Sequence, residues 1–167
     1  MKTKNYLFII FFFTLFSLNS CIKNCLDSGF MFRIRLELET SKSGLLILKY
    51  NSKNSKNLVA KSEIVKIEES QFVEFCLEEE PLEFKIYFIE SVEKVDLKVF
   101  SVLLENTSRQ MFIEQEMFYL YFKNNQNVQY NKDTNTYVFN PHKVGEKNSY
   151  LGSRESLKKR LAKRLKL

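Results

Sequence analysis

The chain has 167 residues, with 26 Lys and Arg against 20 Asp and Glu and a formal charge of +6. This length fits one domain with tails, and four Gly and two Pro exclude a collagen-like or largely disordered chain. The excess charge is terminal: residues 153–167 hold seven basic residues and one acid, whereas residues 21–152 hold 17 basic and 19 acidic residues. This distribution disfavours a nucleic-acid-binding domain with a basic face.

The first twenty residues have the features of a secretion signal. Lys2 and Lys4 precede a run of 13 almost wholly apolar residues, 6–18. Such a run is too short to cross a hydrocarbon core, which needs about 20 residues, but it suits the apolar region of a signal peptide. We therefore expect residues 1–20 to be a signal peptide with an apolar helix.

The segment that follows, Leu18-Asn19-Ser20-Cys21, resembles the lipobox of bacterial lipoproteins. The resemblance implies diacylglyceryl attachment to the Cys21 sulfur, cleavage before Cys21, and acylation of the new amino group by a chain such as palmitate. It also implies a lipid-anchored protein of the cell membrane or outer membrane, facing the periplasm. An ordinary signal peptide and an uncleaved anchor are the alternatives.

Two further cysteines follow. Cys25 lies in a predicted tether, residues 21–29, and Cys76 lies in a strand-like run. The sequence favours two free thiols with Cys76 buried, and a Cys25–Cys76 disulfide in an oxidising compartment is the alternative. The cysteines and the distant His142 do not have the spacing of a zinc site, so neither a metal nor another cofactor is expected.

The body of the chain, residues 30–140, has the period of β-strands. Apolar and charged residues alternate strictly in the opening run, where Phe32, Ile34, Leu36 and Leu38 share one face. Further strands are expected at residues 45–50, 58–67, 72–77, 82–89, 95–104, 117–122, 128–130 and 137–139, whereas 106–115 is the weakest candidate. Short strands with turn signals between them predict an all-β fold, an antiparallel β-sandwich or jelly roll.

Three segments, FRIRLELETSKSGLLILKYN, FVEFCLEEEPLEFKIYFIES and VDLKVFSVLLEN, resemble the galactose-binding-like β-sandwich modules of some bacterial cell-surface proteins. In such proteins the modules occur beside polysaccharide-synthesis segments. The resemblance covers about residues 30–106. It implies a binding or spacer fold rather than an enzyme, and a fold alone does not assign a function.

Two surface patches are candidate ligand sites. Tyr119 and Tyr121, two positions apart on a predicted strand, would share a face that can stack on a sugar ring. Arg33 and Arg35 share a face in the same way. The alternative is that the tyrosines cover a partly buried sheet face, and that the arginines pair with Glu37 or with acids on neighbouring strands.

Evidence for catalysis is weak. The single histidine, His142, has no nucleophile or carboxylate that spacing identifies as its partner. Residues 78–80, three glutamates, lack the spacing of a calcium loop, and no phosphate loop, nucleophile elbow or HExxH motif is present in the sequence. We therefore expect a protein that is not an enzyme.

The last segment, residues 141–167, is expected to form a linker and a basic amphipathic helix. Ser153 would cap the helix, and Leu157, Leu161 and Leu165 recur every four residues on one face. The remaining surface is cationic and includes Lys158, Lys159, Arg160, Lys163 and Arg164. Such a helix can lie on anionic lipid headgroups or dock a partner, and a solvated, frayed helix is the alternative.

Together these features predict a non-catalytic, membrane-anchored lipoprotein of the bacterial cell envelope. It would act as a binding or accessory module, with a link to carbohydrate as one option. Its expected partners are the bilayer, through acylated Cys21, and an envelope protein or glycan, but no nucleic acid. The alternative is a structural or assembly lipoprotein that docks another membrane protein through its aromatic sheet face or its basic tail.

Overall fold

A computed structural model describes residues 25–64, 66–89, 93–141 and 149–165. The predicted signal peptide, Cys21 and His142 lie outside the described residues. None of the helices in the described part of the chain is long and apolar enough to cross a membrane.

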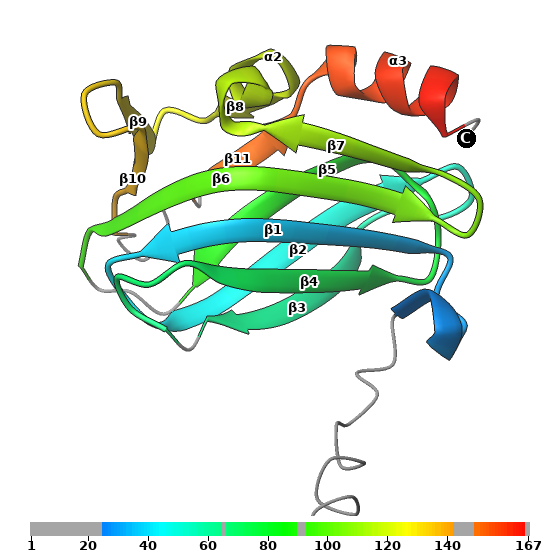
Figure 1. The fold of residues 1–167 in the computed structure, drawn as a ribbon, viewed down its shortest axis with the longest axis horizontal. Coiled ribbons are helices and arrows are strands. Elements are labelled where there is room, and N and C mark those ends of the chain that lie inside the picture. Colours follow the sequence, from blue (N-terminus) through cyan, green and yellow to red (C-terminus); the bar gives the residue numbers. More distant parts are fainter. Residues whose placement is uncertain (1–24, 65, 90–92, 142–148, 166–167) are drawn as a thin grey trace, which may run out of the picture.

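The chain folds into two packed antiparallel sheets (Figure 1), which confirms the predicted all-β sandwich. Sheet A has the order β4-β1-β6-β10-β9, with β7 also paired to β6, and sheet B has the order β3-β2-β5-β11-β8. Sheet A contains β1 (Phe32–Thr40), β4 (Gln71–Leu77), β6 (Val95–Asn106), β7 (Gln110–Glu114), β9 (Val128–Asn131) and β10 (Thr136–Phe139). Sheet B contains β2 (Gly44–Ser52), β3 (Leu58–Ile64), β5 (Pro81–Ile89), β8 (Phe122–Asn124) and β11 (Tyr150–Ser153). The helical segments are η1 (Cys25–Ser28), η2 (Gln115–Met117), α2 (Phe118–Tyr121) and α3 (Glu155–Arg164).

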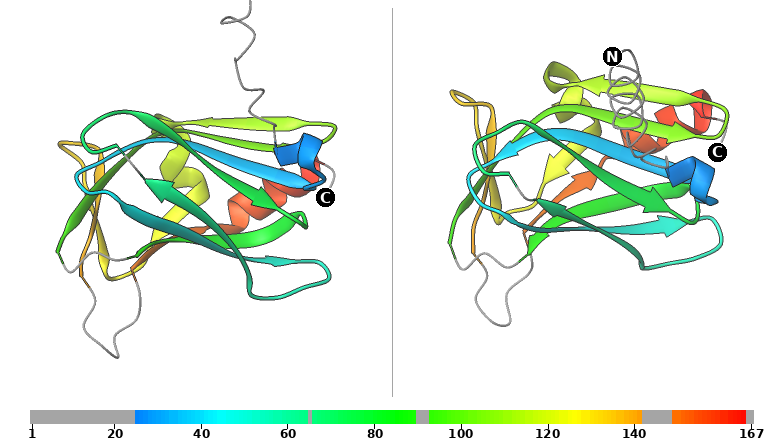
Figure 2. Two further views of the ribbon diagram at one scale, coloured as in Figure 1. Left: turned by 90° about the horizontal axis from the view of Figure 1, so that it is seen from below. Right: turned by 60° about the horizontal axis from the view of Figure 1, so that its bottom comes forward.

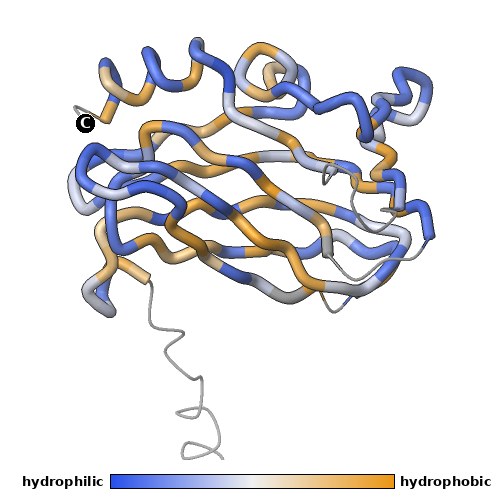
Figure 3. Tube along the Cα trace, turned by 180° about the vertical axis from the view of Figure 1, so that it is seen from behind, coloured by the Kyte–Doolittle hydropathy of each residue, from blue (hydrophilic) through white to orange (hydrophobic). Residues whose placement is uncertain are grey.

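The alternation predicted for the opening strand is present in β1. Its apolar residues are fully buried between the sheets, and its charged residues lie on the outer face. The same alternation of hydropathy recurs along other strands (Figure 3). Because burial of apolar side chains is the main favourable term in folding, this inner layer holds the two sheets together.

The sandwich extends beyond residue 140, the boundary expected from the sequence. β11 inserts between β5 and β8, with Tyr150 opposite Tyr87 and Gly152 opposite Lys123. Sheet B therefore includes residues that were expected to form only a linker. The local sequence cannot show this, because the four residues of β11 pair with strands far away in the chain.

Helix α3 is docked rather than free. Leu157, Leu161 and Leu165 are all fully buried in the common core. Arg154, not Ser153, is the N-cap, and the Ser153 hydroxyl instead accepts a hydrogen bond of 3.0 Å from the Phe84 N–H. The alternative of a frayed, solvated helix is therefore wrong, because burial of the leucine face fixes the helix on the sandwich.

The strand predicted over residues 117–122 is also wrong. The chain forms η2 and the single turn α2, and β8 begins only at Phe122. A helical turn brings Phe118 and Phe122 to the same side, where their rings stack with centroids 4.1 Å apart. Both rings are buried, so tertiary packing overrides the strand propensity of this aromatic segment.

Cys25 and Cys76 form a disulfide with their Cα atoms 5.4 Å apart, which corrects the expectation of two free thiols. Residues 25–28 fold as η1, so the predicted tether does not extend to residue 29. The chain then runs into β1 beside the end of β4, where the Met31 N–H donates to the Leu77 carbonyl at 3.0 Å. This pairing places the two cysteines together, and nothing in their spacing reveals it.

Candidate functional site

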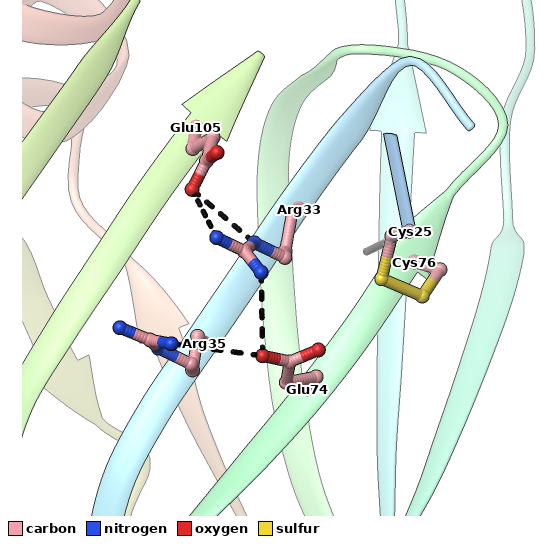
Figure 4. Close-up of polar contacts among 6 residues, drawn as sticks. All are labelled: Cys25, Arg33, Arg35, Glu74, Cys76 and Glu105. Carbon is pink, nitrogen blue, oxygen red and sulfur yellow. Dashed lines mark hydrogen bonds and ion pairs between the residues drawn. A yellow bond between two sulfur atoms is a disulfide. The ribbon is translucent and has the colours of Figure 1, made fainter. Parts of the chain in front are cut away.

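The predicted arginine patch is occupied by intramolecular pairs (Figure 4). Arg33, whose side chain is 12% exposed, places Nη2 2.6 Å from Glu105 Oε2 and Nη1 3.4 Å from Glu74 Oε1. Arg35 approaches the same Glu74 at 3.9 Å and lies over the Phe72 ring. The arginines thus tie neighbouring strands together, as the alternative interpretation held, and neither pairs with Glu37.

The predicted tyrosine platform does not form. Tyr119 and Tyr121 belong to α2, where residues two positions apart point about 200° away from each other. Tyr119 is 62% exposed, whereas Tyr121 packs partly against the core. The two rings therefore cannot stack on one sugar.

The cations of α3 remain on the surface while its leucine face is buried. The exposed set is Lys158, Lys159, Arg160, Lys163 and Arg164. An interfacial amphipathic helix must insert its apolar face into lipid. In α3 that face is already in the protein core, so only electrostatic contact through the basic face is open to it.

A different site lies on the outer face of sheet B. Lys49 on β2 is directly opposite Lys85 on β5, Lys85 is opposite Gly152 on β11, and Gly152 is opposite Lys123 on β8. We call Lys49, Lys85 and Lys123 the lysine row. All three side chains are exposed.

Two tyrosines lie beside the lysine row, on β5 and β11. Tyr87 and Tyr150 are opposite each other, with ring centroids 5.5 Å apart. Lys49 Nζ lies 5.1 Å from the Tyr87 ring centroid, and Lys85 Nζ lies 4.9 Å from the Tyr150 ring centroid. These are cation–π distances, so the rings help to hold the ammonium groups above the sheet.

One acid, Glu83, lines the same pocket as the lysine row, but it forms no ion pair with the row within the described residues. Among the ion pairs of the described residues, none within 4.0 Å involves these three lysines. Glu83, the acid next to them on β5, accepts a hydrogen bond of 2.6 Å from Asn51 Nδ2. Because like charges directly opposite each other destabilise a sheet, an anion bound across the row would relieve this repulsion.

A pocket of about 290 Å³ opens among these groups, and its lining includes all three lysines, both tyrosines, Asn51 and the acid Glu83. Gly152 lies at the bottom of this pocket and has no side chain to fill it. A Cβ added at Gly152 would lie 3.2 Å from Tyr150 Cε2 and 3.7 Å from Lys85 Cγ. Burial, and then the neighbouring Tyr150, raise the pKa of Tyr87 above its ordinary value, so its phenol is protonated near neutral pH. The site therefore combines cations, aromatic faces and neutral hydrogen-bonding groups.

This combination suits an anionic ligand that also offers ring surfaces. Ammonium groups attract carboxylates or sulfates, and aromatic faces stack on apolar ring surfaces. Within the described residues, no group of three His, Cys, Asp or Glu side chains could hold a metal ion.

Sequence reasoning missed this site. The strand period does place Lys85 and Tyr87 on one face of β5. Their alignment with Tyr150, Gly152 and Lys123 depends on β11, whose pairing no local pattern indicates.

Comparisons of the chain with family models, with curated proteins and with solved structures gave no match.

Proposed function

We propose that the protein is a non-catalytic lipoprotein of the bacterial cell envelope that binds an acidic glycan on the outer face of sheet B. The lipobox-like segment ending at Cys21 supports the lipid anchor, with the protein facing the periplasm. One observation carries the binding proposal: the lysine row lies in register across sheet B, beside Tyr87 and Tyr150, and none of its lysines is in an ion pair with another described residue.

The spacing of the lysines favours an oligosaccharide over a single small anion. Lys49 and Lys123 are separated by three strand-to-strand steps, a distance of about 14 Å. That span exceeds one sugar ring, so a chain with acidic groups on successive sugars would contact the whole row. The tyrosines add ring surfaces for stacking, which a site for inorganic phosphate would not need.

The proposal can be tested with the full chain and polygalacturonate, with neutral dextran as the control polymer. We expect binding to polygalacturonate that weakens as salt is added, and no binding to dextran. Lys85→Gln removes the central charge and should weaken binding about tenfold, which corresponds to about 1.4 kcal/mol.

Lys61→Gln provides a matched control. Lys61 is also exposed on the outer face of sheet B, opposite Ile47 on β2, but it lies outside the lysine row. Its substitution should change affinity less than twofold. Equal losses of affinity in the two variants would show that only the overall charge of the protein matters. If the protein bound no acidic glycan and captured an envelope protein, the assembly lipoprotein would be favoured instead.

A further inference from the structure

The end of the sandwich that carries the disulfide also carries a group of basic side chains, and this coincidence bears on how the domain meets the membrane. We infer that this end, with Arg109, Lys163 and Arg164, lies against the lipid headgroup layer. The inference rests on the lipid anchor of the proposed function. It adds an orientation that the anchor alone does not give.

The first step is the length of chain between lipid and fold. Cys25 is buried, and its disulfide to Cys76 fixes it beside the end of β4. Cys21, the predicted acylation site, precedes Cys25 by four positions. Even a fully extended chain spans only about 14 Å over that separation. The disulfide end of the domain must therefore stay within that distance of an acylated Cys21.

The second step is which other groups share this end. Phe32, the first residue of β1, is in register with both Leu77 of β4 and Asn106 of β6. Asn106 Nδ2 donates to the Leu165 carbonyl at 3.4 Å, which brings the last turn of α3 to the same place. Figures 1 and 2 show η1 and the last turn of α3 at the same end of the molecule.

The third step is the chemistry of that end. Arg109 donates from Nη1 to the Arg164 backbone carbonyl at 3.2 Å, and Arg109, Lys163 and Arg164 line one open hollow. Glu105, the acid in this hollow, is held by Arg33 at 2.6 Å. Three cations beside a partly neutralised acid fit the phosphates of a headgroup layer.

Acidic residues are also present at this end of the sandwich. The short segment between Cys21 and Cys25 therefore matters more for the orientation of the domain than the charge of this end does. Glu79 accepts hydrogen bonds from Ser52 and Ser55, and Glu80 accepts one from Asn106. These contacts satisfy the carboxylates of Glu79 and Glu80 within the protein, whereas Asp27 and Glu78 at this end are exposed. The covalent connection through Cys25 therefore sets the orientation, and the basic side chains stabilise it.

The chain contains no tryptophan, so a single introduced Trp can report its own distance from the bilayer. Met31 and Ile67 are matched positions, because they are 54% and 48% exposed and lie at opposite ends of β1. Met31 precedes β1, and Ile67 adjoins Glu68, whose N–H donates to the Thr40 carbonyl. The nine residues of β1 separate the two ends by about 27 Å.

The experiment places the full acylated chain, as Met31→Trp or Ile67→Trp, in vesicles that contain a dansyl-labelled lipid. We expect energy transfer to the dansyl group to be at least threefold more efficient in the Met31→Trp variant than in the Ile67→Trp variant. Equal transfer in two variants that both float with the vesicles would overturn the orientation and leave the anchor intact. A chain that does not float would overturn the anchor, and with it this inference.

Removal of the disulfide tests whether it is the cause of this orientation. When Cys25→Ser and Cys76→Ser are added to each of these variants, the disulfide no longer fixes the end of the tether. We expect the ratio of transfer efficiencies at the two positions to fall toward one while the chain still floats. An unchanged ratio would show that the disulfide does not orient the domain.

Discussion

Lys49 and Lys85 lie directly opposite each other on neighbouring strands, and both ammonium groups rest over tyrosine rings. A like-charged cross-strand pair opposes folding, so its presence has a measurable consequence. Substitution of Lys85 should therefore stabilise the fold and weaken ligand binding.

Lys85→Gln should therefore stabilise the ligand-free protein by about 0.2–1 kcal/mol, because it relieves repulsion on both sides of the row. Chemical denaturation at low ionic strength measures this gain. Salt screens surface charges, so the gain should shrink at about 1 M salt. Lys61→Gln should have no such salt-dependent gain, and a destabilised Lys85→Gln protein would contradict the prediction.

The tyrosines distinguish the site found in the structure from the one expected from the sequence. Tyr150→Ala should weaken binding of polygalacturonate about tenfold, because it removes a ring beside the lysine row and the surface under Lys85. Tyr119→Ala should leave affinity within about twofold, since Tyr119 lies on α2 and not on the outer face of sheet B. Titration calorimetry of both variants provides the comparison, and the reverse order would restore the original candidate.

The disulfide should contribute substantially to stability. Cys25 and Cys76 are 51 positions apart, and closing a loop of that size is worth about 2–4 kcal/mol. Reduction of the wild-type protein should lower its free energy of unfolding by that amount, measured in urea with and without reductant. The Cys25→Ser/Cys76→Ser variant is the control, and it should not respond to reductant.

Helix α3 should behave as part of the folded unit. Leu161→Ala creates a cavity at a fully buried position and should cost about 2–5 kcal/mol. Lys159→Ala, on the exposed face of the same helix, should change stability by less than about 0.5 kcal/mol. Urea denaturation separates the two cases, and similar small effects in both variants would mean that the helix contributes little to the fold.

The elements that the sequence predicts well are those with a strong local period. The buried and exposed faces of β1 follow directly from the alternation that begins at Phe32. The weakest candidate segment, 106–115, does form a strand in part, as β7. Local alternation is informative because the side chains of a strand point to opposite faces with a period of two.

The features that local pattern could not predict all depend on contacts between distant parts of the chain. The Cys25–Cys76 disulfide needs η1 beside the end of β4, and the turn at Phe118 needs its ring stacked on Phe122 in the core. The lysine row needs β11 between β5 and β8. None of these has a signature in a short window of sequence.

The position of β11 also sets the order in which the protein can fold. Among the described strands, β8 joins sheet B through β11, whose residues, 150–153, follow the end of β5 by about 60 positions. Sheet B therefore cannot be completed until this distant segment of the chain is available, and contacts of such long range form slowly. Because Lys123 is aligned with Lys85 through Gly152 of β11, the lysine row would be complete only after this long-range pairing has formed.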